Sequence, residues 1–465
     1  MIMKKGRVYS IDALRGLAII GMVLCSAIGF NSGLPAWMFH AQTPPPTYEF
    51  NPSIAGLTWV DLVFPFFIFS MGAAFPFAMR RRLDSGMRPW KMMLQLLRRW
   101  LTLTAFAIAL GNIYSNAGSS APAWAVSLLN IGFWFSLALC LVQIKADPMD
   151  SGLARWRGRI VNLCGLVLIA ALFVIRRFCF GLSFDYHSND IIILILANLA
   201  LFGSLAWMLS RDNLILRLLF ILLVIAVKAV DSYAPALLDF VPDCGPVSWL
   251  FQWDFLQYLV IALTASIVGD LLLLEQESPD RWDAKRCVSA FICLAAVLFQ
   301  LWALSARQIR IDLLVTLVLA LSFILLNLRS WGIYTRIGYI GFLALMLGIN
   351  LDPLDGGITK DFCNLSYLLT TCGASALMTA FLMMLERHLE LEMKLLCGCG
   401  KNPMAAYTIT GLLTVPLLSL CKLMPLIYSL AEGSIFWGLM QGFILTALMV
   451  LLTNLLSRYK FFLRS

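Results

Sequence analysis

The sequence is poor in charged residues. Lys, Arg, Asp and Glu make up 13% of its 465 residues, whereas 60% are hydrophobic. A soluble globular protein must cover its surface with polar groups, so this balance excludes that class. No segment is long and polar enough to form a separate soluble domain. We therefore expect one transmembrane domain over residues 1–465, and the mean hydropathy of +0.84 agrees.

The chain has instead many apolar runs of roughly 20 residues, each about long enough to cross a bilayer. They predict an all-α polytopic membrane protein, a bundle of about 11–14 transmembrane helices. We place about fourteen spans near residues 10–30, 56–79, 92–112, 121–143, 158–178, 189–209, 213–231, 250–274, 287–305, 311–328, 335–350, 365–385, 402–424 and 433–457. The run 335–350 is short, and a re-entrant segment is its alternative. The first run is expected to be a retained helix because it has no evident small-residue cleavage site.

Lys and Arg are absent from three predicted connecting segments, 31–55, 113–120 and 232–249. The segments that alternate with them are basic, as in Arg80-Arg81-Arg82. Basic loops stay in the cytosol, so we expect both termini to be cytosolic and residues 31–55 to face outward. The net charge of +9 is explained by this orientation, and no nucleic-acid partner is expected.

Cysteine and histidine are not arranged as a metal site. Most of the twelve Cys residues lie within apolar runs, where they act as small hydrophobic side chains. Cys397 and Cys399 form the one close pair, and no partner ligands lie near them in the sequence. We expect unpaired thiols there and no bound metal.

One of the three His residues, His40, stands in the outward segment Pro35–Pro46. The next span opens with Thr58-Trp59-Val60-Asp61, so Asp61 is expected near the outer surface at the depth of His40. A carboxylate there can orient the imidazole and stabilise its protonated form, which favours a catalytic pair. The alternative is an interfacial His beside a helix-capping Asp.

Basic residues at the inner ends of two spans are candidates for binding a phosphate-bearing cytosolic ligand. Arg15 lies on one helix face with Asp12, and Arg98 and Arg99 enter the third span. The alternative is that these residues only set the membrane orientation.

Three further polar residues are candidates for substrate binding from the outer face. His187 precedes the sixth span, Asp254 lies near the start of the eighth, and Lys360 follows two glycines in an outer segment. In each case a helix cap or a plain connecting loop is the alternative.

Several motifs in one order resemble the heparan-α-glucosaminide N-acetyltransferase family, and its bacterial membrane branch in particular. They are Arg7–Gly16, His40-Ala41 and Thr58–Pro65, so the resemblance is sharpest over residues 7–80. Weaker similarity continues at 356–361, 364–367 and 401–403. The resemblance implies a bacterial inner-membrane enzyme that moves an acetyl group from cytosolic acetyl-CoA to an amino sugar on the periplasmic side. It also implies that His40 is catalytic and that Asp61 assists it.

One position departs from that family. Where its best-known branch has an Asn near the end of the first helix, this chain has Ser26, and either Ser26 or Asn31 replaces it as a substrate-binding residue or the reaction differs. An acyltransferase acting on a saccharide is the function that we favour. A secondary transporter for a sugar or sugar conjugate and a non-catalytic subunit of an envelope complex are the alternatives. The sequence leaves open whether the chain acts alone or as a homodimer.

Overall fold

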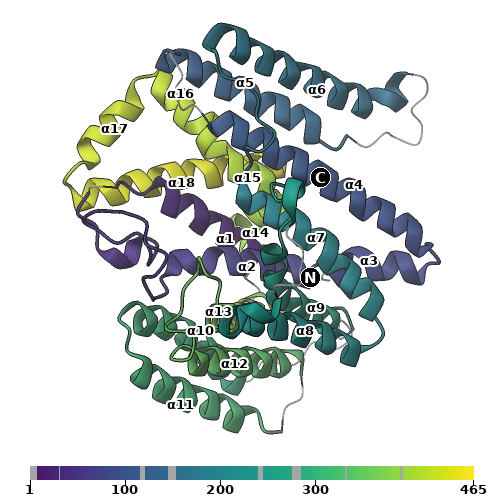
Figure 1. Cartoon of the computed structure of the whole chain (residues 1–465), viewed down its shortest axis with the longest axis vertical. Coiled ribbons are helices and arrows are strands. Elements are labelled where there is room, and N and C mark those ends of the chain that lie inside the picture. The colour runs from purple at the N-terminus through teal and green to yellow at the C-terminus, as the bar shows by residue number, and fades with distance from the viewer. Residues whose placement is uncertain are drawn as a thin grey trace. The chain divides into compact units, whose positions relative to one another are not determined.

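The structure is a computed structural model that describes residues 8–30, 32–115, 121–144, 153–238, 244–274, 284–329, 332–387 and 391–464. Within these ranges it is helical (Figure 1), and the one β-type pairing is an isolated bridge between Val142 and Leu463. The α-helices are α1 Tyr9–Ala27, α2 Trp59–Ala73, α3 Phe75–Asp84, α4 Pro89–Tyr114, α5 Ala123–Leu141, α6 Leu153–Phe180, α7 Ile191–Ser210, α8 Leu214–Tyr233, α9 Leu259–Leu274, α10 Ala284–Ser305, α11 Ile309–Asn327, α12 Ile333–Leu351, α13 Leu365–Arg387, α14 Lys394–Lys401, α15 Pro403–Ile409, α16 Val415–Leu420, α17 Leu423–Ala431 and α18 Ile435–Arg458.

In the described part of the chain, 13 helical segments are long and apolar enough to cross a membrane. This confirms the expected all-α polytopic membrane protein. The short run 335–350 belongs to the full-length helix α12. The expected span 213–231 corresponds to α8, which is not among the 13 because it carries Arg217, Lys228 and Asp231. The expected span 402–424 ends earlier, at Leu420, and α17 follows as a separate helix.

The chain divides into two compact units, each built from three stretches of sequence. Unit 1 comprises residues 1–18, 35–101 and 195–394, and unit 2 comprises 19–34, 102–194 and 395–465. Helices α1, α4 and α7 therefore begin in one unit and end in the other.

In unit 1, glycine allows α2 and α9 to pack at backbone contact. A Cβ atom added at Gly72 would lie 2.1 Å from the carbonyl oxygen of Ala262, and one added at Gly269 would lie 2.2 Å from that of Ala73. Close helix contact of this kind is common in membranes, where small residues replace a hydrophobic driving force. Both contacts lie at the carboxyl-terminal end of α2.

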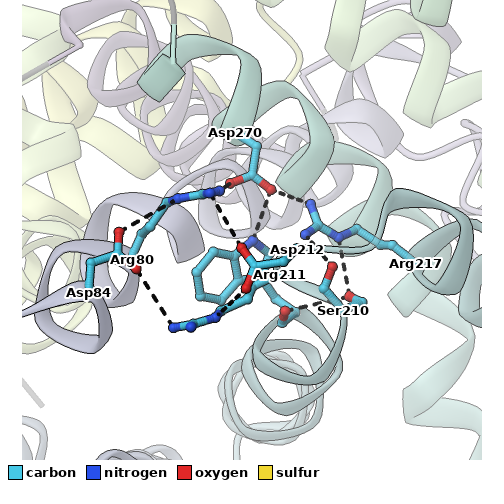
Figure 2. Close-up of polar contacts among 8 residues, drawn as sticks. Arg80, Asp84, Ser210, Arg211, Asp212, Arg217 and Asp270 are labelled. Atoms are coloured by element: carbon cyan, nitrogen blue, oxygen red, sulfur yellow. Dashed lines mark hydrogen bonds and ion pairs between the residues drawn. The ribbon is translucent and has the colours of Figure 1, made fainter. Parts of the chain in front are cut away.

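An ion-pair network of unit 1 joins α3, the α7–α8 connection, α8 and α9 (Figure 2). Asp270 on α9 contacts the guanidinium groups of Arg217 and Arg80, the latter at 3.3 Å, and accepts a hydrogen bond from Trp207 Nε1 at 3.2 Å. Arg217 is 2% exposed, and its charge is compensated by Asp270. Buried charges persist only with such partners, so this network explains how α8 accommodates an arginine.

In unit 2, α5 packs against α6 and α17 against α18. Asp190, immediately before α7, accepts hydrogen bonds from the hydroxyl of Tyr407 at 2.9 Å and from the backbone N–H of Ile193 at 3.1 Å. Near the end of α1, the backbone N–H of Gly29 donates to the carbonyl oxygen of Gly438 on α18 at 3.4 Å.

Candidate active site

Asp61 occupies the third position of α2 and is completely buried. Its Oδ2 atom accepts hydrogen bonds from the backbone N–H of Thr58 at 3.0 Å, from Thr58 Oγ1 at 3.1 Å and from the backbone N–H of Ala41 at 3.4 Å. The contact to the Thr58 N–H is one half of a capping box, which the sequence favours by placing Thr three residues before Asp. The amino-terminal end of a helix also stabilises negative charge. The site therefore holds an ionised carboxylate.

His40 is oriented by this carboxylate. Its Nδ1 atom lies 2.6 Å from Asp61 Oδ1. The loop that carries His40 is held in place because Thr58 Oγ1 donates to the carbonyl oxygen of Phe39 at 2.8 Å. The imidazole side chain is 36% exposed, so one face of it is open to a ligand. When Nδ1–H donates to a carboxylate, Nε2 carries the lone pair and can act as a base or a nucleophile.

Lys360, which is 320 residues away in sequence, completes the group: its Nζ atom lies 3.3 Å from His40 Nδ1. The structure thus brings together three of the residues singled out in the sequence, His40, Asp61 and Lys360. An ammonium group at this place adds positive charge beside the imidazole, which favours stabilisation of an anion.

The segment that carries Lys360 is anchored by polar contacts. Asp352 pairs with Arg307 through two contacts of 2.7 and 2.9 Å, and it accepts a hydrogen bond from the backbone N–H of Ile358 at 2.7 Å. The carbonyl oxygen of Ile358 in turn accepts from the N–H of Gly56 at 2.8 Å, which ties the segment to the residues before α2. Gly357 has φ +110°, and a Cβ atom there would lie 2.5 Å from the Ala55 Cβ, so glycine is required.

Three residues that support this site, Tyr367, Arg307 and Asp352, are not among the candidates predicted from the sequence. The hydroxyl of Tyr367 donates to the carbonyl oxygen of Asp61 at 3.0 Å. Tyr367 has a signal in the sequence, because it lies in one of the segments resembling the bacterial branch. Arg307 and Asp352 pair across 45 residues of sequence, and no local pattern predicts that contact.

The three arginines expected to bind phosphate differ in their surroundings. Arg15 donates to Ser70 through two contacts, Nη2 to the carbonyl oxygen at 3.0 Å and Nε to Oγ at 3.3 Å, and it lies 3.8 Å from Asp12. Arg98 is exposed. The buried Nε of Arg99 has no hydrogen-bond partner among the described residues, and the positive charge of Arg15 acts on this guanidinium.

The remaining candidates do not belong to the triplet of His40, Asp61 and Lys360. Ser26 and His187 belong to unit 2; His187 is largely exposed, and its Nδ1 lies 3.3 Å from Asp185 Oδ1. Asp254 belongs to unit 1, where it is exposed in the turn Trp253–Tyr258. Asn31 lies outside the described residues. Cys397 and Cys399 are both buried in α14, and neither forms a disulfide.

The fold and this site define a class of protein. It is a polytopic membrane protein in which a buried carboxylate, a histidine and a lysine lie together at the start of a helix. The chain belongs to the family defined by a domain of unknown function, DUF5009, which matches residues 7–272. This match includes His40 and Asp61 but ends before Lys360. No curated protein matches the chain.

Proposed function

We propose that the chain is a transmembrane acyltransferase that moves an acetyl group from cytosolic acetyl-CoA to a saccharide acceptor on the other side of the membrane. The observation that carries the proposal is the contact of 2.6 Å between His40 Nδ1 and the buried Asp61 carboxylate. This arrangement is suited to acyl transfer because it orients an imidazole and stabilises its protonated form.

The chemistry follows from these groups. As a general base, Nε2 of His40 removes a proton from the acceptor amine or hydroxyl while that atom attacks the thioester carbonyl. The C–S bond then breaks as the intermediate collapses, and His40 returns the proton to the departing thiolate of CoA. In the alternative route, Nε2 attacks the thioester, the C–S bond breaks and the thiolate of CoA leaves. The acceptor then attacks the acetyl group, the bond to Nε2 breaks, and the proton of the acceptor goes to the thiolate. In both routes the ammonium of Lys360 lies on the Nδ1 side of the ring, 3.3 Å from that atom, and its positive charge partly offsets the negative charge that develops on the thioester oxygen.

Arg15 and Arg99 support the binding of the CoA phosphates. The positive charges of Arg15 and Arg99 repel each other, and a bound anion relieves this repulsion. The Nε atom of Arg99, without a partner among the described residues, is a donor that a phosphate oxygen can satisfy. Both arginines lie in segments that we expect to begin at the cytosolic surface. This supports a polar donor that enters from the cytosol and presents its thioester within the helix bundle.

The nature of the acceptor rests on the family resemblance. The resemblance to the heparan-α-glucosaminide N-acetyltransferase family implies an amino sugar, and it supports the proposal of a bacterial inner-membrane enzyme of that kind. The expected outward position of His40, in a segment without Lys or Arg, supports delivery to that side.

A second candidate function, a secondary transporter, is favoured by a different observation. Asp312 on α11 is completely buried, and it accepts hydrogen bonds from the amide of Gln300 at 2.6 Å and from the hydroxyl of Thr316 at 3.1 Å. Among the described residues no cation pairs with it. A carboxyl group buried within membrane helices without a cation is typical of proton-coupled transport.

The two functions are separated by reconstituting the protein in vesicles with acetyl-CoA on one side and labelled amino sugars on the other. An acyltransferase acetylates sugar in the far compartment, loses this activity in His40→Ala and keeps it in Asp312→Asn. A transporter accumulates unmodified sugar, and Asp312→Asn stops the accumulation. Accumulation of unmodified sugar that is unaffected by His40→Ala would replace the acyltransferase proposal by the transporter.

A further inference from the structure

Unit 2 contains a pocket with a volume of about 360 Å³, lined by residues from the end of α1, α17 and α18 and from the segments that follow α1 and α17. Polar side chains on its wall are Ser26, Tyr428, Glu432 and Gln441, and Phe30 adds an aromatic ring. Its volume lies at the lower end of the range for small-molecule sites. A pocket of this size holds a ligand about as large as a single sugar ring.

The inner wall is fixed by Gln441, which is 5% exposed. Its Nε2 donates to the carbonyl oxygen of Ala27 at 2.9 Å, so the orientation of the amide is determined. Its Oε1 atom is buried and has no hydrogen-bond partner within the part of the chain that the structure describes. An unsatisfied buried acceptor is costly, and a ligand O–H or N–H that reaches it removes this cost.

Glycine contacts make this wall rigid. A Cβ atom added at Gly438 would lie 2.3 Å from the Ser32 Cβ, and one added at Gly29 would lie 3.4 Å from the Gly438 Cα. The end of α1 and the start of α18 are therefore in backbone contact beside Gln441. Such a wall is formed before any ligand arrives, which lowers the entropy cost of binding.

The outer part of the pocket combines one carboxylate with two aromatic rings. Glu432 follows α17, is exposed and has no ion-pair partner among the described residues. The side chains of Phe30 and Tyr428 are 53% and 50% exposed. A carboxylate next to aromatic faces attracts a cation both by charge and by the ring quadrupole. Aromatic faces also cover the apolar face of a ring-shaped polyol.

We propose that this pocket binds a sugar-sized, hydroxylated primary amine. Glu432 pairs with its ammonium group, Phe30 and Tyr428 contact the ring, and Gln441 Oε1 accepts a hydrogen bond from a hydroxyl. Glu432 thereby distinguishes a free amine from an N-acetylated one. The identification of this ligand as the acyl acceptor rests on the proposed function, whereas the pocket and its preference for an amine do not.

The test is calorimetric titration of the full-length protein in lipid nanodiscs, without acyl-CoA. The probes are glucosamine, glucose, N-acetylglucosamine and ethanolamine. Glucosamine is expected to bind tightest. Glu432→Gln is expected to weaken glucosamine binding about tenfold, as for loss of a charged hydrogen bond, and to leave glucose binding unchanged. Gln441→Met is expected to weaken all three sugars. Glu392→Gln, on an exposed carboxylate paired with Lys394 in unit 1, is the matched control.

The proposal is overturned if wild-type protein binds none of the sugars, if Glu432→Gln keeps the preference for glucosamine, or if ethanolamine binds as tightly as glucosamine. Because no acyl donor is present, the outcome is independent of acyl transfer. If the protein binds amines selectively but does not acetylate them, the pocket proposal is supported and the acyltransferase proposal is overturned. If the protein acetylates amino sugars but Glu432→Gln leaves sugar binding unchanged, the acyltransferase is supported and the pocket proposal is overturned.

Discussion

The carboxylate of Asp61 lies 2.6 Å from the imidazole of His40 and is shielded completely from solvent. Its other oxygen is held by the N–H and hydroxyl groups of Thr58. The contacts that cap the start of α2 therefore also hold the carboxylate that orients the imidazole. Removing the negative charge of Asp61 is expected to lower the reactivity of His40.

Lys360→Met tests the ammonium beside His40. We expect kcat for acetyl transfer to fall by about 10²–10³-fold, as for loss of one group that stabilises an oxyanion, with little change in the KM for acetyl-CoA. Steady-state kinetics of the purified protein measures both quantities. Lys394→Met is the control, since Lys394 is exposed and pairs with Glu392. Equal kcat values for Lys360→Met and wild type would remove Lys360 from the catalytic group.

Asp270→Asn tests the ion-pair network of Figure 2. The change leaves Arg217, which is 2% exposed, without its compensating charge. Breaking a buried pair in this way is expected to lower the unfolding free energy by about 3 kcal/mol. Asp212→Asn is the control, since Asp212 is 64% exposed and its pairs with Arg80 and Arg211 are expected to contribute below about 1 kcal/mol. Denaturation in detergent measures the unfolding free energy of both variants. Similar losses for the two would contradict the assignment of Asp270 as the compensating charge of Arg217.

Gly72→Ala tests the packing of α2 on α9. The added methyl group would meet the Ala262 carbonyl oxygen at 2.1 Å, and backbone cannot yield as a flexible side chain does. We expect a loss of about 1–3 kcal/mol in unfolding free energy. Gly132→Ala is the comparison in another helix, because its methyl group meets only the Leu172 side chain, at 3.3 Å. There the better helix propensity of Ala is expected to leave the melting temperature unchanged or higher. A melting temperature for Gly72→Ala equal to wild type would show that the helices are not so closely packed.

Asp190→Asn tests the effect of pH on unit 2. Burial raises the pKa of the Asp190 carboxyl above its ordinary value of 3.8, although hydrogen bonds from Ile193 and Tyr407 act in the opposite direction. Between 3.8 and the raised pKa, the folded state binds more protons than the unfolded state. The unfolding free energy therefore decreases as pH rises through this window. Melting temperatures measured from pH 4 upward are expected to show this decrease in wild type and a smaller one in the variant. An equal decrease of the melting temperature with pH in wild type and in Asp190→Asn would show that Asp190 is not the source of the decrease.

The fold class could be predicted from the sequence because apolar runs of membrane length are a local signal. The run of α8 shows the limit of this signal. Residues 213–231 are apolar on average, yet Arg217 depends on Asp270, which is distant in the chain. Such a long-range ion pair is not visible in a hydrophobic run.

The candidate site was predictable in part for a similar reason. His40 lies in the connection between α1 and α2, and Asp61 lies in the first turn of α2. Their expected position near the same membrane surface therefore follows from the order of the spans. The position of Lys360 depends on the backbone contact between Gly56 and Ile358 and on the Arg307–Asp352 pair. These contacts join segments about 300 residues apart or pair side chains across loops, and no periodic pattern encodes them.

The most direct test of the acyltransferase is transfer of labelled acetyl from acetyl-CoA by purified protein to a panel of amino sugars. His40→Ala, Asp61→Asn and His187→Ala are measured beside wild type, the last as the control for an exposed histidine. We expect wild type and His187→Ala to acetylate at least one amino sugar, and the other two to lose about 10²–10⁴-fold in rate while remaining folded. Transfer by His40→Ala at the wild-type rate, or failure of wild type to bind or turn over acetyl-CoA with any acceptor, would contradict the assignment.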